Sequence, residues 1–236
     1  MSEWAAKRFW DKAGVVALDT GFTIALDGRP VKTPAKAPLV VPTQSMAAAI
    51  AVEWDAQVDK IDPMTMPITR GANAAVDKVA VQFDEVAEML AAYGDSDLLC
   101  YRAAGPEELI GLQNKAWDPL LDWAGATLNA PLISAEGVMH VPQDPAVLVR
   151  LRAKVDELTP FQLAAFHDLV SLSGSLILAL AFTHGRLSAD EAWTLSRIDE
   201  DYQISQWGPD DEAEALTKIK HTAFLNAARF FAMCLT

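Results

Sequence analysis

The spacing of apolar residues changes at Thr43, and this change constrains the fold more than any other feature of the chain. Before Thr43, short apolar runs alternate with turn residues, a pattern typical of short β-strands. The runs cover residues 15–18, 21–26, 31–33 and 39–41. Asp27-Gly28 separates two of them and tolerates the positive φ of a tight hairpin. After Thr43 the apolar residues recur at helical spacing. The sequence therefore predicts an α+β protein, a small antiparallel β-rich N-terminal domain followed by a multihelical C-terminal domain.

Thr43 is a suitable N-cap for the first predicted helix. The apolar stripe of this helix consists of Met46, Ile50, Trp54, Val58 and Ile61. Because Trp54 lies on the stripe, we expect its indole to be largely buried and to have a structural role. The helix should end at residues 62–67, whose two prolines make a stiff connector. This connector predicts a boundary between a β-rich domain, residues 1–67, and a helical domain, residues 68–236.

Beyond the connector, the apolar period predicts six helices. They cover residues 69–92, 106–126, 145–157, 159–184, 188–207 and 210–233. Ser188 and Glu191 form a capping box at the start of one helix. Ser173-Gly174-Ser175 lies inside another, where we expect the small residues to permit close helix packing. The segment 97–101 fits either a strand or a helical turn.

Composition narrows the range of partners. The hydrophobic share of 51% provides for a sizeable core, and the formal charge is −13. This charge argues against nucleic acid, whose phosphates require clustered Lys and Arg, and against an anionic membrane surface. The longest apolar run, residues 169–182, is shorter than a bilayer span. We therefore expect a buried core helix there and no membrane insertion.

The cysteines and the N-terminus indicate a compartment. Cys100 and Cys234 have no metal-ligand spacing and suit free thiols in a reducing environment. The leading Met-Ser-Glu-Trp-Ala has neither the apolar core of a secretory signal nor an Arg-rich amphipathic segment. We therefore expect a cytoplasmic protein.

The chain contains one weak match to a catalytic motif. Asp19-Thr20-Gly21 follows an apolar strand, as in aspartic proteases, but those enzymes need two such loops to pair two carboxylates. As a turn between strands, the tripeptide needs no special role. The histidines His140, His167, His184 and His221 are scattered, and no phosphate-binding loop, dinucleotide fingerprint or nucleophile elbow is present. The sequence predicts no catalytic, cofactor-binding or metal-binding residue.

One predicted helical stripe carries aromatic and charged residues that a monomer core does not obviously need. On the helix predicted for 188–207 it consists of Trp193, Arg197, Glu200, Ile204 and Trp207. One alternative buries the stripe in a helical bundle with Arg197 paired to Glu200. The other places it against a partner, because Trp and Arg are favoured at binding hot spots. The surrounding segment 190–214 holds nine acidic residues and one base. This acidic segment is either a solvated face of the protein or a surface that steers a basic partner toward it.

A set of short segments follows one order along nearly the whole chain. They are Lys7-Arg8-Phe9-Trp10 and the segments 26–34, 53–57, 61–63, 66–70, 97–102, 174–181 and 202–208. Together they resemble the chaperones that bind the alpha subunit of the ATP synthase's soluble catalytic sector before assembly. The resemblance implies a small β-domain joined to an all-helical domain, the alpha subunit as partner, no enzymatic activity and no cofactor. The lack of a visible transit peptide fits a bacterial member of this family. We expect the protein to be a monomer.

Two positions depart from the family pattern. Gly71 stands where a larger apolar residue is usual, and Pro209-Asp210-Asp211-Glu212 aligns loosely. The resemblance leaves open which C-terminal acid carries the family's functional carboxylate, so Asp211 and Glu212 join Glu200 as partner-binding candidates. The rival hypotheses are a hydrolase that uses carboxylates such as Asp19 or Glu200, and a permanent subunit of another complex.

Overall fold

The computed structural model describes residues 7–235, and its contacts divide the chain into two compact units. The first contains the chain up to Phe83, Thr159–Ala165 and the segment from Asn226 on; the second contains Asp84–Leu158 and Phe166–Leu225. The expected division into domains after residue 67 stays a prediction.

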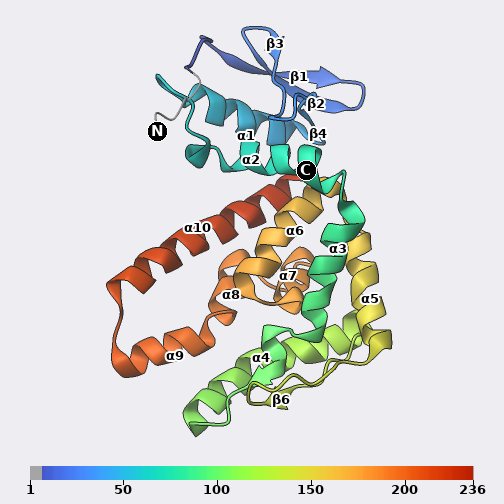
Figure 1. Ribbon diagram of the computed structural model, residues 1–236, viewed down its shortest axis with the longest axis vertical. Helices are drawn as coiled ribbons and strands as arrows, with labels where there is room; N and C mark the ends of the chain where they lie inside the picture. The colour runs from blue at the N-terminus through green and yellow to red at the C-terminus, as the bar shows by residue number, and fades with distance from the viewer. Residues whose placement is uncertain (1–6, 236) are drawn as a thin grey trace. The chain divides into compact units, whose positions relative to one another are not determined.

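The first unit is built on a small antiparallel sheet (Figure 1). Its strands are β1 (Ala13–Leu18), β2 (Gly21–Leu26), β3 (Arg29–Pro30) and β4 (Val40–Val41). Strand β2 pairs with all three others. Asp27 and Gly28 make the predicted tight turn, with φ of 46° and 81°. Because helices make up most of the rest of the chain, the predicted α+β class is confirmed.

Helix α1 (Gln44–Asp55) covers this sheet. Thr43 caps it as predicted, since its side chain accepts a hydrogen bond from the Met46 backbone N–H. Met46 and Ile50 are fully buried, so the helical spacing after Thr43 identified the face that packs inward.

Trp54 differs from the sequence-based expectation. The helix ends at Asp55, and Val58 beyond it is 77% exposed, so the apolar stripe does not continue. Trp54 is half-buried rather than largely buried. Its indole packs edge-on against the buried Trp10, with ring centroids 5.2 Å apart. The tryptophan therefore closes one end of the α1 packing face.

The predicted stiff connector leads into a helix that a side chain of α1 caps. It forms a short 3-10 turn, Pro63–Thr65, before helix α2 (Pro67–Ala74) begins. The Glu53 carboxylate accepts hydrogen bonds of 2.7 Å from the backbone N–H groups of Ile68 and Thr69. These N–H groups lie in the first turn of α2 and have no partner within the helix, so Glu53 caps it from a distance.

The small residue at position 71 in α2 leaves room for an aromatic ring. A Cβ atom at this position would lie 2.8 Å from the ring of Phe230, which is 3% exposed. Phe230 belongs to helix α10 (Asp211–Met233) and also stacks on Phe161. The Phe230 ring thus fills the space that a larger side chain at position 71 would occupy.

We expect Gly71→Ala to lower the free energy of unfolding by about 1–3 kcal/mol, because the added methyl overpacks this contact. Gly111→Ala is the matched control, since a Cβ there meets nothing within 4 Å and alanine favours a helix by about 0.5–1 kcal/mol. Denaturant titration of both variants measures the difference. Equal stabilities would contradict the packing argument.

The helix predicted for 69–92 is interrupted. Helix α2 ends at Ala74, a π-helical turn follows at Ala75–Val79, and α3 spans Phe83–Ala91. The ambiguous segment after it contains both alternatives, because a 3-10 turn at Leu98–Cys100 leads into strand β5 (Tyr101–Arg102). Strand β5 pairs in parallel with β6 (Ala135–Glu136).

The remaining helices follow the predicted segments with two breaks. They are the 3-10 turn Ala92–Asp95, α4 (Glu107–Thr127), α5 (Pro145–Asp156), α6 (Pro160–Ser173), α7 (Leu176–Thr183), α8 (Ala189–Leu195), α9 (Ile198–Trp207) and α10. Within residues 7–235, no helix combines the length and the apolar character needed to cross a bilayer.

The first break divides the helix predicted for 159–184. Gly174 has φ of +71° and ends α6, and Ser175 caps α7 through its hydrogen bond from the Leu178 N–H. The expectation that these small residues serve helix packing was wrong. Asp97 is fully buried beneath the break and accepts hydrogen bonds from the Ser175 hydroxyl at 2.7 Å and the Ile177 N–H at 3.0 Å.

Candidate partner-binding site

The second break divides the helix that was to carry the candidate stripe. Helix α8 ends at Leu195 and α9 begins at Ile198. Between them the Ser196 hydroxyl donates to the Trp193 carbonyl at 2.7 Å, and this local bond competes with continued helix. The prediction of one continuous stripe across 188–207 was therefore wrong, although the capping box of Ser188 and Glu191 is confirmed.

Trp193 belongs to the core of the second unit. It is 7% exposed and packs against α10, with its ring stacked 5.1 Å from His221 and tilted 5.6 Å from Phe224. A side chain enclosed in this way is unavailable to a partner. The sequence left two alternatives for the stripe, burial in a helical bundle or contact with a partner, and Trp193 is buried.

Arg197 links α8 to the start of α9. Its guanidinium lies 5.6 Å from the Trp193 ring centre, 3.5 Å from the Glu200 carboxylate and 3.9 Å from that of Asp201. The expected pairing of Arg197 with Glu200 is present. The arginine side chain is 14% exposed but that of Glu200 is 52% exposed, so the carboxylate remains accessible.

The inner face of α9 is fixed to α4 by residues that the sequence analysis did not single out. Gln113 is 1% exposed, and its amide donates a 2.6 Å hydrogen bond to the Asp199 carboxylate. The Trp117 indole N–H donates to the carbonyl of Leu195, the last residue of α8, at 2.9 Å. These contacts hold the end of α8 and the first turn of α9 on α4.

Beyond these anchors, α9 and the first half of α10 expose apolar side chains. We name residues 198–220 the arm; its two helices meet at a turn (Figure 1). On α9, Ile204 is 43% and Trp207 80% exposed; on α10, Leu216 is 51% and Ile219 67% exposed. Each pair is three residues apart and so shares one helix face. Leu216 and Ile219 were missed as candidates, although their helical spacing was visible in the sequence.

The arm is also acidic. Asp211 and Glu212 are exposed in the first turn of α10, where the helix dipole favours negative charge. With Glu200 and Asp201 on α9, they give the arm more acidic than basic side chains, the bases being Lys218 and Lys220. This combination suits a partner surface that has both apolar and basic residues.

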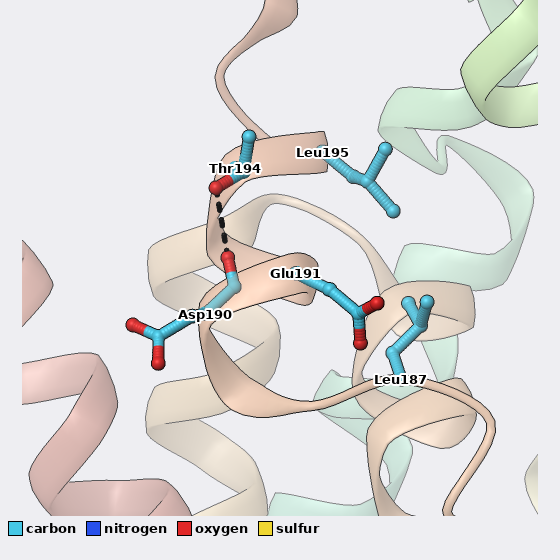
Figure 2. A pocket seen from close by; sticks show the side chains of 5 residues that line it. All are labelled: Leu187, Asp190, Glu191, Thr194 and Leu195. Atoms are coloured by element: carbon cyan, nitrogen blue, oxygen red, sulfur yellow. Dashed lines mark hydrogen bonds between the residues drawn. The ribbon is translucent and has the colours of Figure 1, made fainter.

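A shallow hollow of about 350 Å³ adjoins the start of α8 (Figure 2). It is lined by Leu187, Asp190, Glu191, Thr194 and Leu195. The Glu191 carboxylate is committed to the capping box, and its hydrogen bonds from Ser188 hold its pKa below the ordinary value. The Asp190 carboxylate lies 3.5 Å from His221 Nε2, so the hollow offers mainly its two leucines.

Catalytic groupings are not apparent among the described side chains. Within residues 7–235, no cluster of three His, Cys, Asp or Glu residues is placed to hold a metal ion. Asp19, the carboxylate of the protease-like tripeptide, occupies the exposed turn between β1 and β2. Its place in a two-residue hairpin turn accounts for the tripeptide.

Comparison with known proteins decides the family. The family model described as "ATP12 chaperone protein" matches residues 7–125, half of the chain. The chain belongs to the ATP12 chaperone family. This confirms the resemblance noted in the sequence, which is to chaperones of ATP synthase assembly.

Relatives of the ATP12 family extend the match beyond residue 125. The crystal structure of Atp12 from Paracoccus denitrificans is 52% identical, with a TM-score of 0.95 over 98% of this chain and 100% of that one. An aspartate-to-lysine variant of the same protein gives the same identity and TM-score, over 99% and 100%. The mitochondrial protein atp12 of Schizosaccharomyces pombe is 26% identical over 222 residues, 89% of this chain and 76% of the relative. The arm therefore lies within the part that the ATP12 structures share.

Proposed function

We propose that this chain is a non-enzymatic assembly chaperone that binds the unassembled alpha subunit of the ATP synthase through the arm. In a bacterial cell it acts in the cytoplasm as a monomer. The observation that carries this proposal is the exposure of Trp207 and Ile219, at 80% and 67%, within an acidic surface of a protein from a chaperone family.

The physical reason lies in the client. A subunit built for a multisubunit enzyme exposes apolar surface before its neighbours arrive, and such patches cause aggregation. A chaperone without a nucleotide motor must cover the patch reversibly and yield it to the true partner by mass action. Exposed apolar side chains give contact area, and the carboxylates of the arm accelerate encounter with a basic surface.

The rival functions predict different behaviour. A permanent subunit would remain in the mature complex at fixed stoichiometry, whereas a chaperone leaves it. A hydrolase would depend on carboxylates such as Asp19 or Glu200 for turnover, and substitution of either would abolish its reaction without changing capture of a client.

Light scattering during dilution of purified, isolated alpha subunit tests the proposal. We expect an equimolar amount of the chain to suppress scattering without ATP, and to be absent from ATP synthase purified after assembly. Unchanged scattering, or recovery of the chain in the mature enzyme, would reject the chaperone assignment.

A charge reversal tests the acidic surface. We expect Glu200→Lys to change stability by no more than about 0.5 kcal/mol, because its carboxylate is 52% exposed, and to weaken capture of the alpha subunit by tenfold or more, about 1.4 kcal/mol. Glu88→Lys is the matched control: Glu88 pairs with Arg152 at 3.0 Å and is 80% exposed. Equal binding by both variants would remove Glu200 from the contact and direct attention to Asp211 and Glu212.

A further inference from the structure

The edge of the N-terminal sheet is a strand without charge or proline of its own. Strand β1 (Ala13–Leu18) lies at the sheet edge and pairs only with β2 among the described strands (Figure 1). None of its six residues is charged, and Val15, Val16 and Leu18 are 37%, 42% and 44% exposed. Soluble proteins usually block such an edge with charge, proline or a bulge, because it invites another strand.

The register shows which backbone groups are available. Leu18 pairs with Gly21 across a two-residue turn, so Gly14, Val16 and Leu18 exchange hydrogen bonds with β2. The N–H and C=O groups of the alternate residues then point outward. Ala13 is consistent with this alternation, since its N–H donates to the Asp55 carboxylate at 2.7 Å instead of to β2.

Val15 and Ala17 are the two outward-facing residues that remain. Neither backbone makes a hydrogen bond to another part of residues 7–235. We propose that this edge pairs with an extended, uncharged, β-branched segment of the client, which adds a strand antiparallel to β1. The inference rests on the proposed function, since it takes the client to be the unassembled alpha subunit.

Charge at the two ends of β1 indicates the chemistry of this segment. Lys12 precedes the strand and Asp19 follows it, and both are exposed. An antiparallel partner places its own N-terminal end beside Asp19 and its C-terminal end beside Lys12. Because the Asp55 carboxylate already occupies the Lys12 end of the edge, only the Asp19 end is open to a charged partner. The complementary segment therefore has a base just before its uncharged, apolar or Thr-containing stretch.

A second copy of this chain is a weaker occupant. A six-residue strand is only about 20 Å long, and one strand pair falls short of the roughly 800 Å² per partner of a stable interface. Two chains that each carry a net charge of −13 also repel each other.

Two variants at one position test the edge. Ala17→Pro removes the outward N–H and fills the pairing side with a ring, while the β1–β2 hydrogen bonds at Val16 and Leu18 stay intact. Ala17→Val keeps the N–H and is the matched control. With the full-length chain, we expect Ala17→Pro to weaken binding of isolated alpha subunit at least fivefold and Ala17→Val to leave it unchanged, with circular dichroism confirming that both are folded.

Amide hydrogen exchange gives the decisive readout. On addition of alpha subunit, we expect at least tenfold slower exchange at the Val15 and Ala17 amides of the unaltered chain. Slowing confined to the arm would overturn the edge inference and leave the proposed function standing, whereas no binding at all would reject the proposed function. Slowing in the chain alone that rises with its concentration, together with a doubled mass that Ala17→Pro abolishes, would assign the edge to a second copy and overturn the client assignment.

Discussion

Asp97→Ala is expected to lower the free energy of unfolding by about 3–5 kcal/mol. The carboxylate is 0% exposed and joins two segments that are far apart in sequence. It accepts hydrogen bonds from the Ser175 hydroxyl and the backbone N–H groups of Leu99 and Ile177. Alanine leaves all three donors buried without this partner, and each unsatisfied donor costs about 1–3 kcal/mol. Urea or thermal unfolding at pH 7 measures the loss.

Asp144→Ala is the matched control for this prediction. Asp144 also caps a helix, accepting the Ala146 N–H at 2.8 Å, but it is exposed to water. Loss of such a cap costs about 1 kcal/mol. If the two variants are equally stable, the buried network around Asp97 does not have the structural role assigned to it.

The same carboxylate makes stability depend on pH. Burial raises the pKa of Asp97 from 3.8 to about 6, against the opposing effect of its hydrogen bonds. Between these values the folded state holds a proton that the unfolded state has released. Relative to its value below about pH 4, the contribution of Asp97 falls by roughly 3 kcal/mol as pH rises to 6, and the loss expected for Asp97→Ala at pH 7 is what remains. We expect the stability of the unaltered chain, relative to Asp97→Asn, to decline across this window; a constant difference would contradict the raised pKa.

The largest expected effect on binding comes from the apolar residues of the arm. We expect Trp207→Ser combined with Ile219→Ser to weaken binding of the alpha subunit by about thirtyfold or more, since truncation of a hot-spot residue costs at least about 2 kcal/mol. Both side chains are mostly in water in the free protein, so stability should change by less than about 1 kcal/mol. Isothermal titration and thermal unfolding of the same preparation separate the two effects.

The sequence predicted the fold class because local signals and tertiary packing agree there. The Asp27-Gly28 turn and the cap at Thr43 are backbone requirements that few residues satisfy. The two helix breaks were not predicted, because at these positions the local apolar pattern and the tertiary contacts disagree. Gly174 and Ser196 interrupt apolar runs whose periodicity continues on both sides. The distant Asp97 holds the first break, whereas the second combines the local bond from Ser196 to Trp193 with the distant bond from Trp117 to Leu195.

The candidate site could be predicted in composition but not in geometry. The acidic segment and Trp207 were visible in the sequence, and both are exposed in the structure. Trp193 was placed with Trp207 because one helix was assumed. The turn at Ser196 separates them, which buries the first and exposes the second. No periodic pattern reveals that Gln113 would anchor Asp199, because that bond joins residues 86 positions apart.

The most direct test of the account compares two β-branched residues of equal exposure in the second unit. Ile219 on the arm is 67% exposed and Val149 on α5 is 68% exposed. Titration of purified alpha subunit into Ile219→Ser, Val149→Ser and the unaltered chain measures the binding affinity of each. The comparison shows how much the affinity depends on the position of the lost apolar side chain. We expect affinity at least fivefold weaker for Ile219→Ser and unchanged for Val149→Ser. Equal affinities for both variants would contradict the assignment of the arm as the surface that holds the subunit.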